Sequence, residues 1–294
     1  RNCMVAFNPA LQTHACLCWY SPDRDAHLLR RYRLASDAAR GMAQEQFSLV
    51  YQPRYDLRDG QPVSAEALLR WTHPMLGPIT PGEFIPVLEC TALMPALSQW
   101  VIEHAFAQAA RWQQLLPGFT LSINLSPRDF DNANLWTGMA ERLQANGLVP
   151  SQIEVEITEG QWLHSHPAAL PQLRAMAAAG VRIAIDDFGS GYSNFGYLSE
   201  VPISHIKVDQ SLVTGLARSR TARLKVEAII RLAQQLGYRT VAEGVEHESE
   251  LSLLRLWDCN EAQGYYLARP MSADAVTQLV LACRAGPPLE ADGD

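Results

Sequence analysis

The sequence predicts an α/β fold in which eight strands close into a barrel, with the first strand antiparallel to the rest. Three observations support this prediction: a β-hairpin opens the pattern, strands then alternate with helices, and eight strand candidates are present in all. The length of 294 residues also suits one barrel, since barrel domains run to roughly 250 residues. An open, doubly wound sheet is the structural alternative.

The hairpin follows a predicted helix over residues 29–45, which has a charged face. Its first strand is FSLVYQPRYDL, its turn contains Asp59-Gly60, and its second strand is PVSAEALLRW. An Asp-Gly pair favours the left-handed backbone of the tight turns that join antiparallel strands. Residues 1 to about 28 contain Asn8-Pro9 and Ser21-Pro22 and are expected to form an irregular lead-in.

Six more strand candidates follow the hairpin, and helical stretches separate them. Parallel strands need long crossover connections, so this alternation predicts a parallel sheet covered by helices. The expected strands cover residues 119–126, 153–159, 181–188, 205–210, 239–245 and 262–268, and the expected helices cover 94–116, 133–147, 167–179, 218–236, 248–257 and 273–284.

The composition narrows the class of function. A formal net charge of −7 argues against sequence-blind binding to long nucleic acid, but it allows a small anionic ligand held by metal ions. The six cysteines form no C-x-x-C pair, which favours a reduced, cytoplasmic setting. No run of about 18 apolar residues predicts a membrane span. Because the chain starts at Arg1, we expect a piece of a longer protein, in which a membrane anchor can lie elsewhere.

Charged and amide side chains recur on one face of the predicted strands. Parallel barrel strands are covered on the outside and packed on the inside, so they are expected to be nearly all apolar. Here alternate positions are polar, with the period of two that a strand imposes. The sets are Ser64, Glu66, Leu68 and Arg70; Ser122, Asn124 and Ser126; Glu154, Glu156 and Thr158; Asp186-Asp187; His205, Lys207 and Asp209; and Glu243.

Buried carboxylates of this number need compensation. An unpaired buried charge costs on the order of several kcal/mol, so such groups are paired or bind a metal, and one lysine cannot neutralise four or five of them. Oxygen ligands suit Mg²⁺ or Mn²⁺, and two ions about 3.5–4 Å apart serve phosphodiester hydrolysis. Barrel active sites are found at the C-terminal ends of the strands, where Asp186, Asp187 and Glu243 lie. The predicted ligands are Glu66, Asn124, Glu156, Asp186, Asp187 and Glu243.

Each of these residues has an ordinary structural interpretation when taken alone. Asn124 can satisfy backbone groups, Lys207 can extend its ammonium group to solvent, and the two aspartates can cap a helix. Their coincidence at matching strand positions favours the metal site. The His164-Ser165-His166 segment is interpreted as a cap or surface loop rather than a zinc site.

Eight sequence blocks, in order and spacing, resemble the EAL-domain cyclic di-GMP phosphodiesterases over about residues 36 to 283. The blocks are YQPRYDL, AEALLRW, SINLSP, IEVEITE, IDDFGSGYSNFGYL, IKVDQSLV, VAEGVE and AQGYYLARP. The resemblance implies a TIM-like (β/α)8 barrel with an antiparallel first strand. It divides the chain into a lead-in or linker from a preceding domain (1–35), a phosphodiesterase barrel (36–284) and a flexible tail (285–294).

The resemblance also implies roles for single residues. The six predicted ligands match metal-binding positions of the family, and Glu66 and Glu243 are catalytic together with Lys207, which matches the residue that orients the attacking water. Glu159 matches the glutamate that anchors the loop after strand five, Phe188 to Ser193, which the family links to a homodimer. The matches to substrate-binding positions are Gln52, Arg70, Asp209 and Gln263.

The function implied by the resemblance is hydrolysis of cyclic di-GMP to linear pGpG, with two Mg²⁺ or Mn²⁺ ions and attack by water. A receptor that binds cyclic di-GMP without cleaving it is the alternative, and a scaffold domain is a third. Receptors of this kind typically lack the signature glutamate or have a degraded loop after strand five. Both features are intact here, because Glu66 and Gly191-Tyr192-Ser193 are present, although Asn194-Phe195-Gly196 departs from the family pattern.

Overall fold

The computed structural model describes residues 22–159, 166–190, 198 and 200–285. The chain divides into two compact units: one comprises residues up to Ser48 together with Arg70–Met94, and the other comprises Leu49–Leu69 and the chain from Pro95 onward. Most of the expected lead-in, His164 and the tail from residue 286 lie outside the described residues. Within the described part, no helix is long and apolar enough to cross a membrane.

The first unit is built around an aromatic cluster. Phe47 stacks on Trp71 with ring centroids 4.9 Å apart, and Phe84 meets the Trp71 ring edge-on at 5.6 Å. These three buried side chains join the strand ends of this unit to a short helix. The elements of the unit are α2 (Pro22–Ala43), the outer parts of β1 and β2, β3 (Gly77–Ile79) and α3 (Pro81–Leu88).

Two features of the first unit differ from the sequence prediction. Residues 22–28, expected to be irregular, belong to α2, because Pro22 is its first residue and proline is favoured at the start of a helix. The strand β3 and the helix α3 were not predicted. Gly77-Pro78, Pro81-Gly82 and Pro86 resemble loop signals, yet Pro81 also starts a helix, and Phe84, Val87 and Leu88 bury its apolar face.

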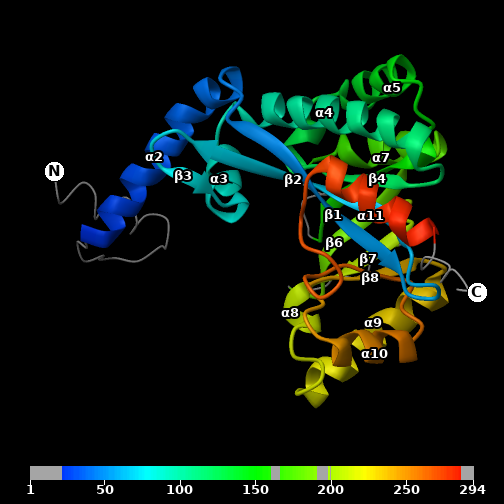
Figure 1. The fold of residues 1–294 in the computed structure, drawn as a ribbon. Helices are drawn as coiled ribbons and strands as arrows, with labels where there is room; N and C mark the ends of the chain where they lie inside the picture. Colours follow the sequence, from blue (N-terminus) through cyan, green and yellow to red (C-terminus); the bar gives the residue numbers. More distant parts are fainter. Residues whose placement is uncertain (1–21, 160–165, 191–197, 199, 286–294) are drawn as a thin grey trace, which may run out of the picture. The chain divides into compact units, whose positions relative to one another are not determined.

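The second unit is a closed barrel (Figure 1). Strand β1 pairs antiparallel with β9, the next pairs from β9 round to β2 are parallel, and a β1–β2 pairing closes the circle. The predicted barrel with an antiparallel first strand is confirmed, and the open sheet is wrong. The barrel strands are β1 (Phe47–Asp56), β2 (Pro62–His73), β4 (Thr120–Asn124), β5 (Ile153–Thr158), β6 (Arg182–Phe188), β7 (His205–Val208), β8 (Arg239–Ala242) and β9 (Glu261–Ala262).

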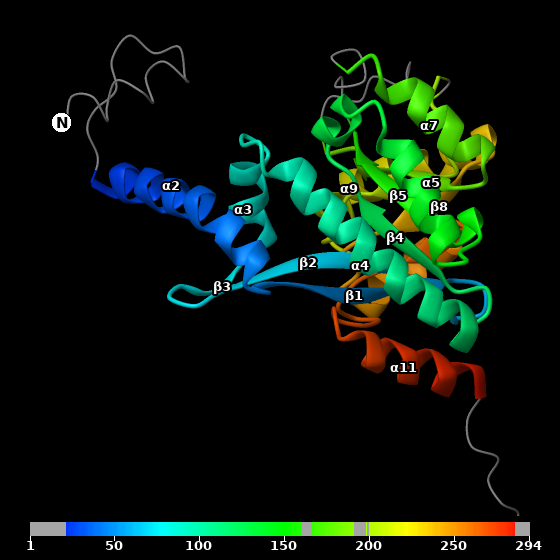
Figure 2. The same cartoon turned by 90° about the horizontal axis from the view of Figure 1, so that it is seen from above.

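Helices lie around the outside of these strands in both views (Figure 1, Figure 2). Outward-facing apolar residues such as Ile123, Val155 and Ile183 are fully buried between strands and helices. This packing holds the other face of each strand, with its polar side chains, inside the barrel. The helices are α4 (Met94–Leu115), α5 (Leu135–Ala145), α7 (Ala169–Ala178), α8 (Gln210–Val213), α9 (Arg220–Leu236), α10 (Glu248–Leu256) and α11 (Ala273–Ala285), with 3-10 turns at Pro127–Asp131 and Pro150–Gln152.

The last strand is shorter than predicted. The sequence predicts a strand over 262–268, but β9 ends at Ala262 and the chain then turns, with the backbone N–H groups of Leu267 and Ala268 donating to Gly264 O. The reason is a close approach at Gly264, where a Cβ atom would lie 2.2 Å from both the N and the O of Val245. This turn positions Gln263 at the end of the barrel.

Candidate active site

A buried lysine gathers four carboxylates at the C-terminal end of the barrel strands. The Nζ atom of Lys207 lies 2.6 Å from Glu156 Oε2, 2.7 Å from Glu243 Oε1, 2.9 Å from Asp186 Oδ1 and 3.7 Å from Glu66 Oε2. Only 1% of Lys207 is exposed. Four residues predicted as metal ligands therefore surround one ammonium group.

Amide side chains hold Glu66 from two sides. Asn124 Nδ2 donates to Glu66 Oε1 at 2.8 Å, and Gln263 Nε2 donates to Glu66 Oε2 at 2.8 Å. Gln263 also lies 3.1 Å from Gln52 Oε1, and Gln52 donates to the carbonyl of Ala268 at 3.1 Å. In the structure, the predicted residues Asn124 and Gln263 thus bind the Glu66 carboxylate, and Gln52 binds Gln263.

A bulge in β6 turns two consecutive aspartates toward one place. Neighbouring residues of a regular strand point to opposite faces. Here the β6–β7 register shifts between Ile185 and Phe188, and Asp187 takes a left-handed backbone with φ of 54°. Ligand oxygens of Asp186, Asp187 and Glu243 consequently lie within 4.8 Å of one another, close enough to share a metal ion.

The loop after β6 is tied to the site by Glu159. Its Oε2 atom accepts the backbone N–H of Gly189 at 2.7 Å, and its own N–H donates to Asp186 O at 2.9 Å. A Cβ at Gly189 would lie 2.7 Å from Leu212 Cδ1, so the loop starts in close contact with the next helix. Residues 191–193 of the predicted loop lie outside the described residues.

Asp209 caps the short helix α8 and faces the acidic pair. Its Oδ1 atom accepts the backbone N–H of Ser211 at 2.9 Å. Burial, then the charge of Asp186, then the charge and hydrogen bond of Asp209 raise the pKa of Asp187 to about 6. Asp209 therefore lies at the edge of the carboxylate cluster.

The carboxylates share a limited positive charge, and their pKa values diverge. Burial raises the pKa of Glu156 well above its ordinary value, with the charge of Glu66 acting in the same direction. Burial alone would also raise the pKa of Glu66, but Lys207 and the two amides hold it below its ordinary value. Burial and the charge of Asp186 raise the pKa of Glu243 to about 8, although Lys207 opposes them.

Lys207 stays charged in these surroundings. Burial by itself would lower the pKa of a lysine, but the surrounding carboxylates, led by Asp186 and Glu156, hold it well above its ordinary value. One cation still leaves the cluster with more acidic groups than it can neutralise. An all-oxygen donor set with excess carboxylates fits hard divalent cations.

A cavity of about 300 Å³ opens beside the cluster. Six of its lining residues were predicted as site residues, and the sequence interpretation missed the other six. Position could have found five of these, since they come within a few residues after β7, β8 or β9 at the C-terminal end of the barrel, whereas Leu68 lies within β2. The lining residues are Gln52, Glu66, Leu68, Asp186, Asp187, Gln210, Glu243, Gly244, Glu246, Gln263, Gly264 and Tyr265.

One residue predicted to bind the substrate lies in a different compact unit from the others. Arg70 belongs to the first unit, whereas the other predicted site residues belong to the second. Its role in substrate binding stays a prediction.

Substitution of Gly264 by alanine is expected to destabilise the protein and disturb the site. The added Cβ would meet the backbone of Val245, which cannot move aside as a flexible side chain would. We expect the free energy of unfolding to fall by about 3 kcal/mol, a value at the upper end for overpacking. Thermal unfolding measures this effect, with Gly82→Ala as control, because a Cβ at this helical glycine meets nothing within 4 Å. Equal melting temperatures for the two variants would contradict the prediction.

Comparison with known sequences finds one family over most of the chain. The family model of the EAL domain matches residues 35–270. A cyclic di-GMP phosphodiesterase of Pseudomonas aeruginosa is 42% identical over 253 residues, covering 86% of this chain and 43% of that protein. The bifunctional diguanylate cyclase/cyclic di-GMP phosphodiesterase MucR of the same species is 36% identical over 261 residues, covering 87% and 38%. The chain spans less than half the length of these relatives.

Solved structures share the fold over a similar part. The MucR phosphodiesterase in complex with cyclic di-GMP superposes with a TM-score of 0.78 at 36% identity, covering 83% of this chain and 99% of that one. The EAL enzyme Bd1971, bound to cAMP and cyclic di-GMP, gives a TM-score of 0.82 at 28% identity, covering 86% and 69%.

Proposed function

Because the chain belongs to the EAL domain family, we propose that it hydrolyses cyclic di-GMP to the linear dinucleotide pGpG. The observation that carries this proposal is the cluster of four carboxylates around Lys207, which adjoins a cavity at the C-terminal end of the barrel. Two relatives are named as cyclic di-GMP phosphodiesterases, and both related structures described above contain this nucleotide. The catalytic unit is the barrel of residues 36–284.

Divalent cations complete the site in this proposal. They would supply charge neutralisation at the phosphodiester and a water that ionises near neutral pH. The acidic excess around Lys207 and the raised pKa values of Glu156 and Glu243 support a place for them. The residues that would hold two ions, Mg²⁺ or Mn²⁺, are Glu66, Asn124, Glu156, Asp186, Asp187 and Glu243.

Lys207 orients the attacking water through its ammonium group. Its contacts with Asp186 and Glu243 keep Nζ at the centre of the cluster, and its raised pKa keeps the group charged over the neutral range. A fixed cation at this position also stabilises negative charge that develops on the phosphate. Glu66 and Glu243 are catalytic as carboxylates that contact this ammonium group.

The remaining residues bind the nucleotide or hold the loop. Gln52, Gln263 and Asp209 contact the substrate, as does Arg70 in the family pattern. Glu159 fixes the start of the loop after β6 through the Gly189 N–H. The same loop forms the contact between two copies of the chain in a homodimer.

Purified protein is expected to convert cyclic di-GMP to pGpG only when Mg²⁺ or Mn²⁺ is present. Removal of the cations with EDTA should abolish turnover. Without the positive charges of the cations, the carboxylates repel the dianionic nucleotide. Chromatography of the nucleotides measures substrate and product, and addition of excess Mn²⁺ should restore the rate. Cyclic di-GMP left intact at micromolar enzyme would overturn the catalytic proposal.

A binding assay beside the turnover assay separates the enzyme from a receptor. A receptor binds cyclic di-GMP and releases it unchanged, whereas an enzyme at the same protein concentration yields pGpG. Binding without turnover by the unmutated protein would favour the receptor, and absence of both would leave neither function supported.

A further inference from the structure

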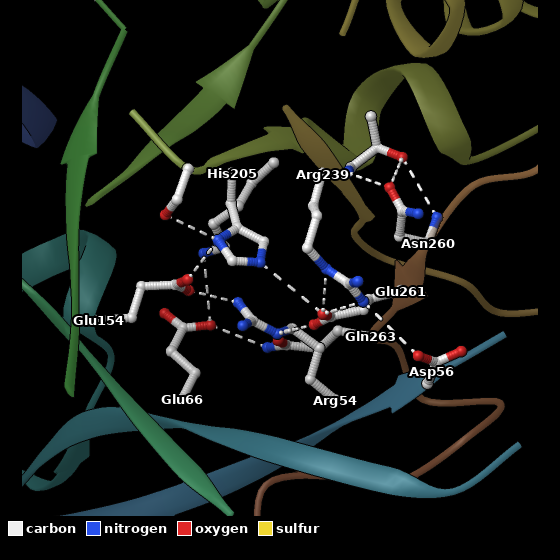
Figure 3. Close-up of polar contacts among 12 residues, drawn as sticks. Arg54, Asp56, Glu66, Glu154, His205, Arg239, Asn260, Glu261 and Gln263 are labelled. Atoms are coloured by element: carbon white, nitrogen blue, oxygen red, sulfur yellow. Dashed lines mark hydrogen bonds and ion pairs between the residues drawn. The ribbon is translucent and has the colours of Figure 1, made fainter. Parts of the chain in front are cut away.

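A second set of charged side chains lies inside the barrel, two residues closer to the N-terminal ends of the strands than the site. Glu154, His205 and Glu261 precede Glu156, Lys207 and Gln263 by two positions, so they occupy the same strand faces one step lower. Figure 3 shows them converging on a guanidinium group from β1. We call this set the lower layer, and its members are Arg54, Glu154, His205 and Glu261.

Arg54 is clamped by the two carboxylates of the lower layer. Its Nη1 atom lies 2.6 Å from Glu154 Oε1, and its Nε atom lies 2.7 Å from Glu261 Oε2. Only 1% of Arg54 is exposed. The contact with Glu154 is a hydrogen bond, whereas the contact with Glu261 is an ion pair without one, and together they hold the guanidinium between the two carboxylates.

His205 contacts both carboxylates of the lower layer. Its Nδ1 atom lies 2.8 Å from Glu154 Oε2, and Nε2 lies 3.8 Å from Glu261 Oε1. Burial opposes the charged form of His205, but Glu154 raises its pKa above the ordinary value. Burial likewise opposes the charge of Glu261, yet Arg54 and His205 lower its pKa to about 2. Glu154 and Glu261 therefore each contact Arg54 and His205, and Glu261 also pairs with Arg239, whose Nη2 atom lies 2.9 Å from Glu261 Oε1.

Arg54 also reaches the layer above. Its Nη1 atom lies 3.8 Å from Glu156 Oε1, while Lys207 Nζ lies 2.6 Å from Glu156 Oε2. Among the described residues, Glu156 Oε1 accepts no hydrogen bond from an N–H or O–H donor. The fully buried carboxylate of Glu156 thus stands between two cations, one in each layer.

We propose that Arg54 is a positioning residue for Glu156. It faces Oε1 and thereby fixes the carboxylate in the orientation in which Oε2 faces Lys207 and the cation site. The proposal rests on the proposed function, in which Glu156 is a metal ligand. Groups that orient ligating carboxylates typically change metal affinity or activity by about 10–100-fold when they are removed.

Stability alone does not account for these charges. Interior positions of such barrels are commonly filled by branched apolar side chains. Replacing a buried ion cluster by apolar residues of similar volume is often neutral or stabilising, so the lower layer is a weak source of stability. Orientation of a metal ligand gives Arg54 a role that an apolar side chain could not fill.

Removal of Arg54 by Arg54→Met is expected to raise the dissociation constant for Mn²⁺ about 10-fold or more. Calorimetric titration of the metal-free protein with Mn²⁺, without nucleotide, measures this constant. The single substitution leaves Glu154 and Glu261 short of a cation and so also lowers the melting temperature. Higher Mn²⁺ concentrations should restore much of the turnover of the variant, and assays well below its melting temperature keep the folded fraction constant.

The double substitution Arg54→Met/Glu154→Met separates positioning from stability. It removes one charge of each sign, and Glu261 keeps Arg239 Nη2 at 2.9 Å and His205 Nε2 at 3.8 Å as partners. We expect its melting temperature to return toward that of the unmutated protein while its dissociation constant for Mn²⁺ stays raised. Arg58→Met is the control, because Arg58 is an exposed arginine that pairs with Asp56.

Unchanged Mn²⁺ binding by the folded double variant would overturn the role of Arg54 and leave the metal site standing. Absence of Mn²⁺ binding by the unmutated protein would instead overturn the metal site, and the positioning role with it.

Discussion

Asp186→Asn is expected to lower kcat/KM for cyclic di-GMP at least about 1000-fold, which corresponds to about 4 kcal/mol of transition-state stabilisation. The substitution keeps the shape of the side chain but removes the charge that the proposed metal ligand needs. Its Oδ1 atom lies 2.9 Å from Lys207 Nζ and accepts the Asp187 N–H at 3.0 Å, and an asparagine Oδ1 can keep both contacts. Nucleotide chromatography under saturating Mn²⁺ measures the loss.

The stability of Asp186→Asn, unlike its activity, should not fall. The metal-free site holds more acidic groups than Lys207 can neutralise, so removal of one charge should leave the melting temperature unchanged or slightly higher. Asp258→Asn is a matched control, since Asp258 is exposed and has φ of 57°, a backbone that asparagine also accepts. Activity of Asp186→Asn within tenfold of the unmutated protein would refute the assigned role.

Lys207→Met is expected to destabilise the metal-free protein by about 3 kcal/mol or more, because buried carboxylates then lose their cation. For a chain of this size the melting temperature should fall by roughly 6 °C or more. Added Mg²⁺ or Mn²⁺ should raise the melting temperature of this variant more than that of the unmutated protein, since the ions replace the missing charge. Turnover should stay about 1000-fold lower even with the ions, because no ammonium group orients the water.

Differential scanning fluorimetry with and without cations tests the stability part, and nucleotide chromatography tests the activity part. Lys225→Met is the matched control, because this lysine is exposed on α9. If both lysine variants lose equal stability, or if turnover of Lys207→Met recovers with added metal, the role given to Lys207 is wrong.

The sequence predicted the barrel because its strand periodicity and alternation are local and strong. The polar faces of β2, β4, β5 and β7 could be read from the period of two, and they contain Glu66, Asn124, Glu156 and Lys207. The confirmed closure of the barrel then follows from the number of strands and from the hairpin.

Other features depend on packing between distant segments. The end of β9 is set by the contact of Gly264 with Val245, 19 residues earlier, and no local pattern marks it. The joint orientation of Asp186 and Asp187 depends on a bulge, whereas strand periodicity alone would separate them.

The sequence also did not reveal how the buried charges are paired. Periodicity places Glu154 with Glu156 and His205 with Lys207, as if each pair served one site. In the structure the members of each pair lie in different layers, and Arg54, which was not considered, compensates the lower one. Charged residues on one face of a strand can pair with different groups, because their partners lie on the neighbouring strands.

The left-handed backbone at Asp187 has a consequence for protein engineering. A non-glycine residue in this conformation costs of order 1 kcal/mol, and Asp187 also carries a raised pKa among other acids. A selection for heat resistance would therefore favour glycine at this position, and it would do so by discarding a proposed metal ligand. Thermostabilised descendants of this protein should be screened for catalysis at every round, because at this residue stability and activity favour different side chains.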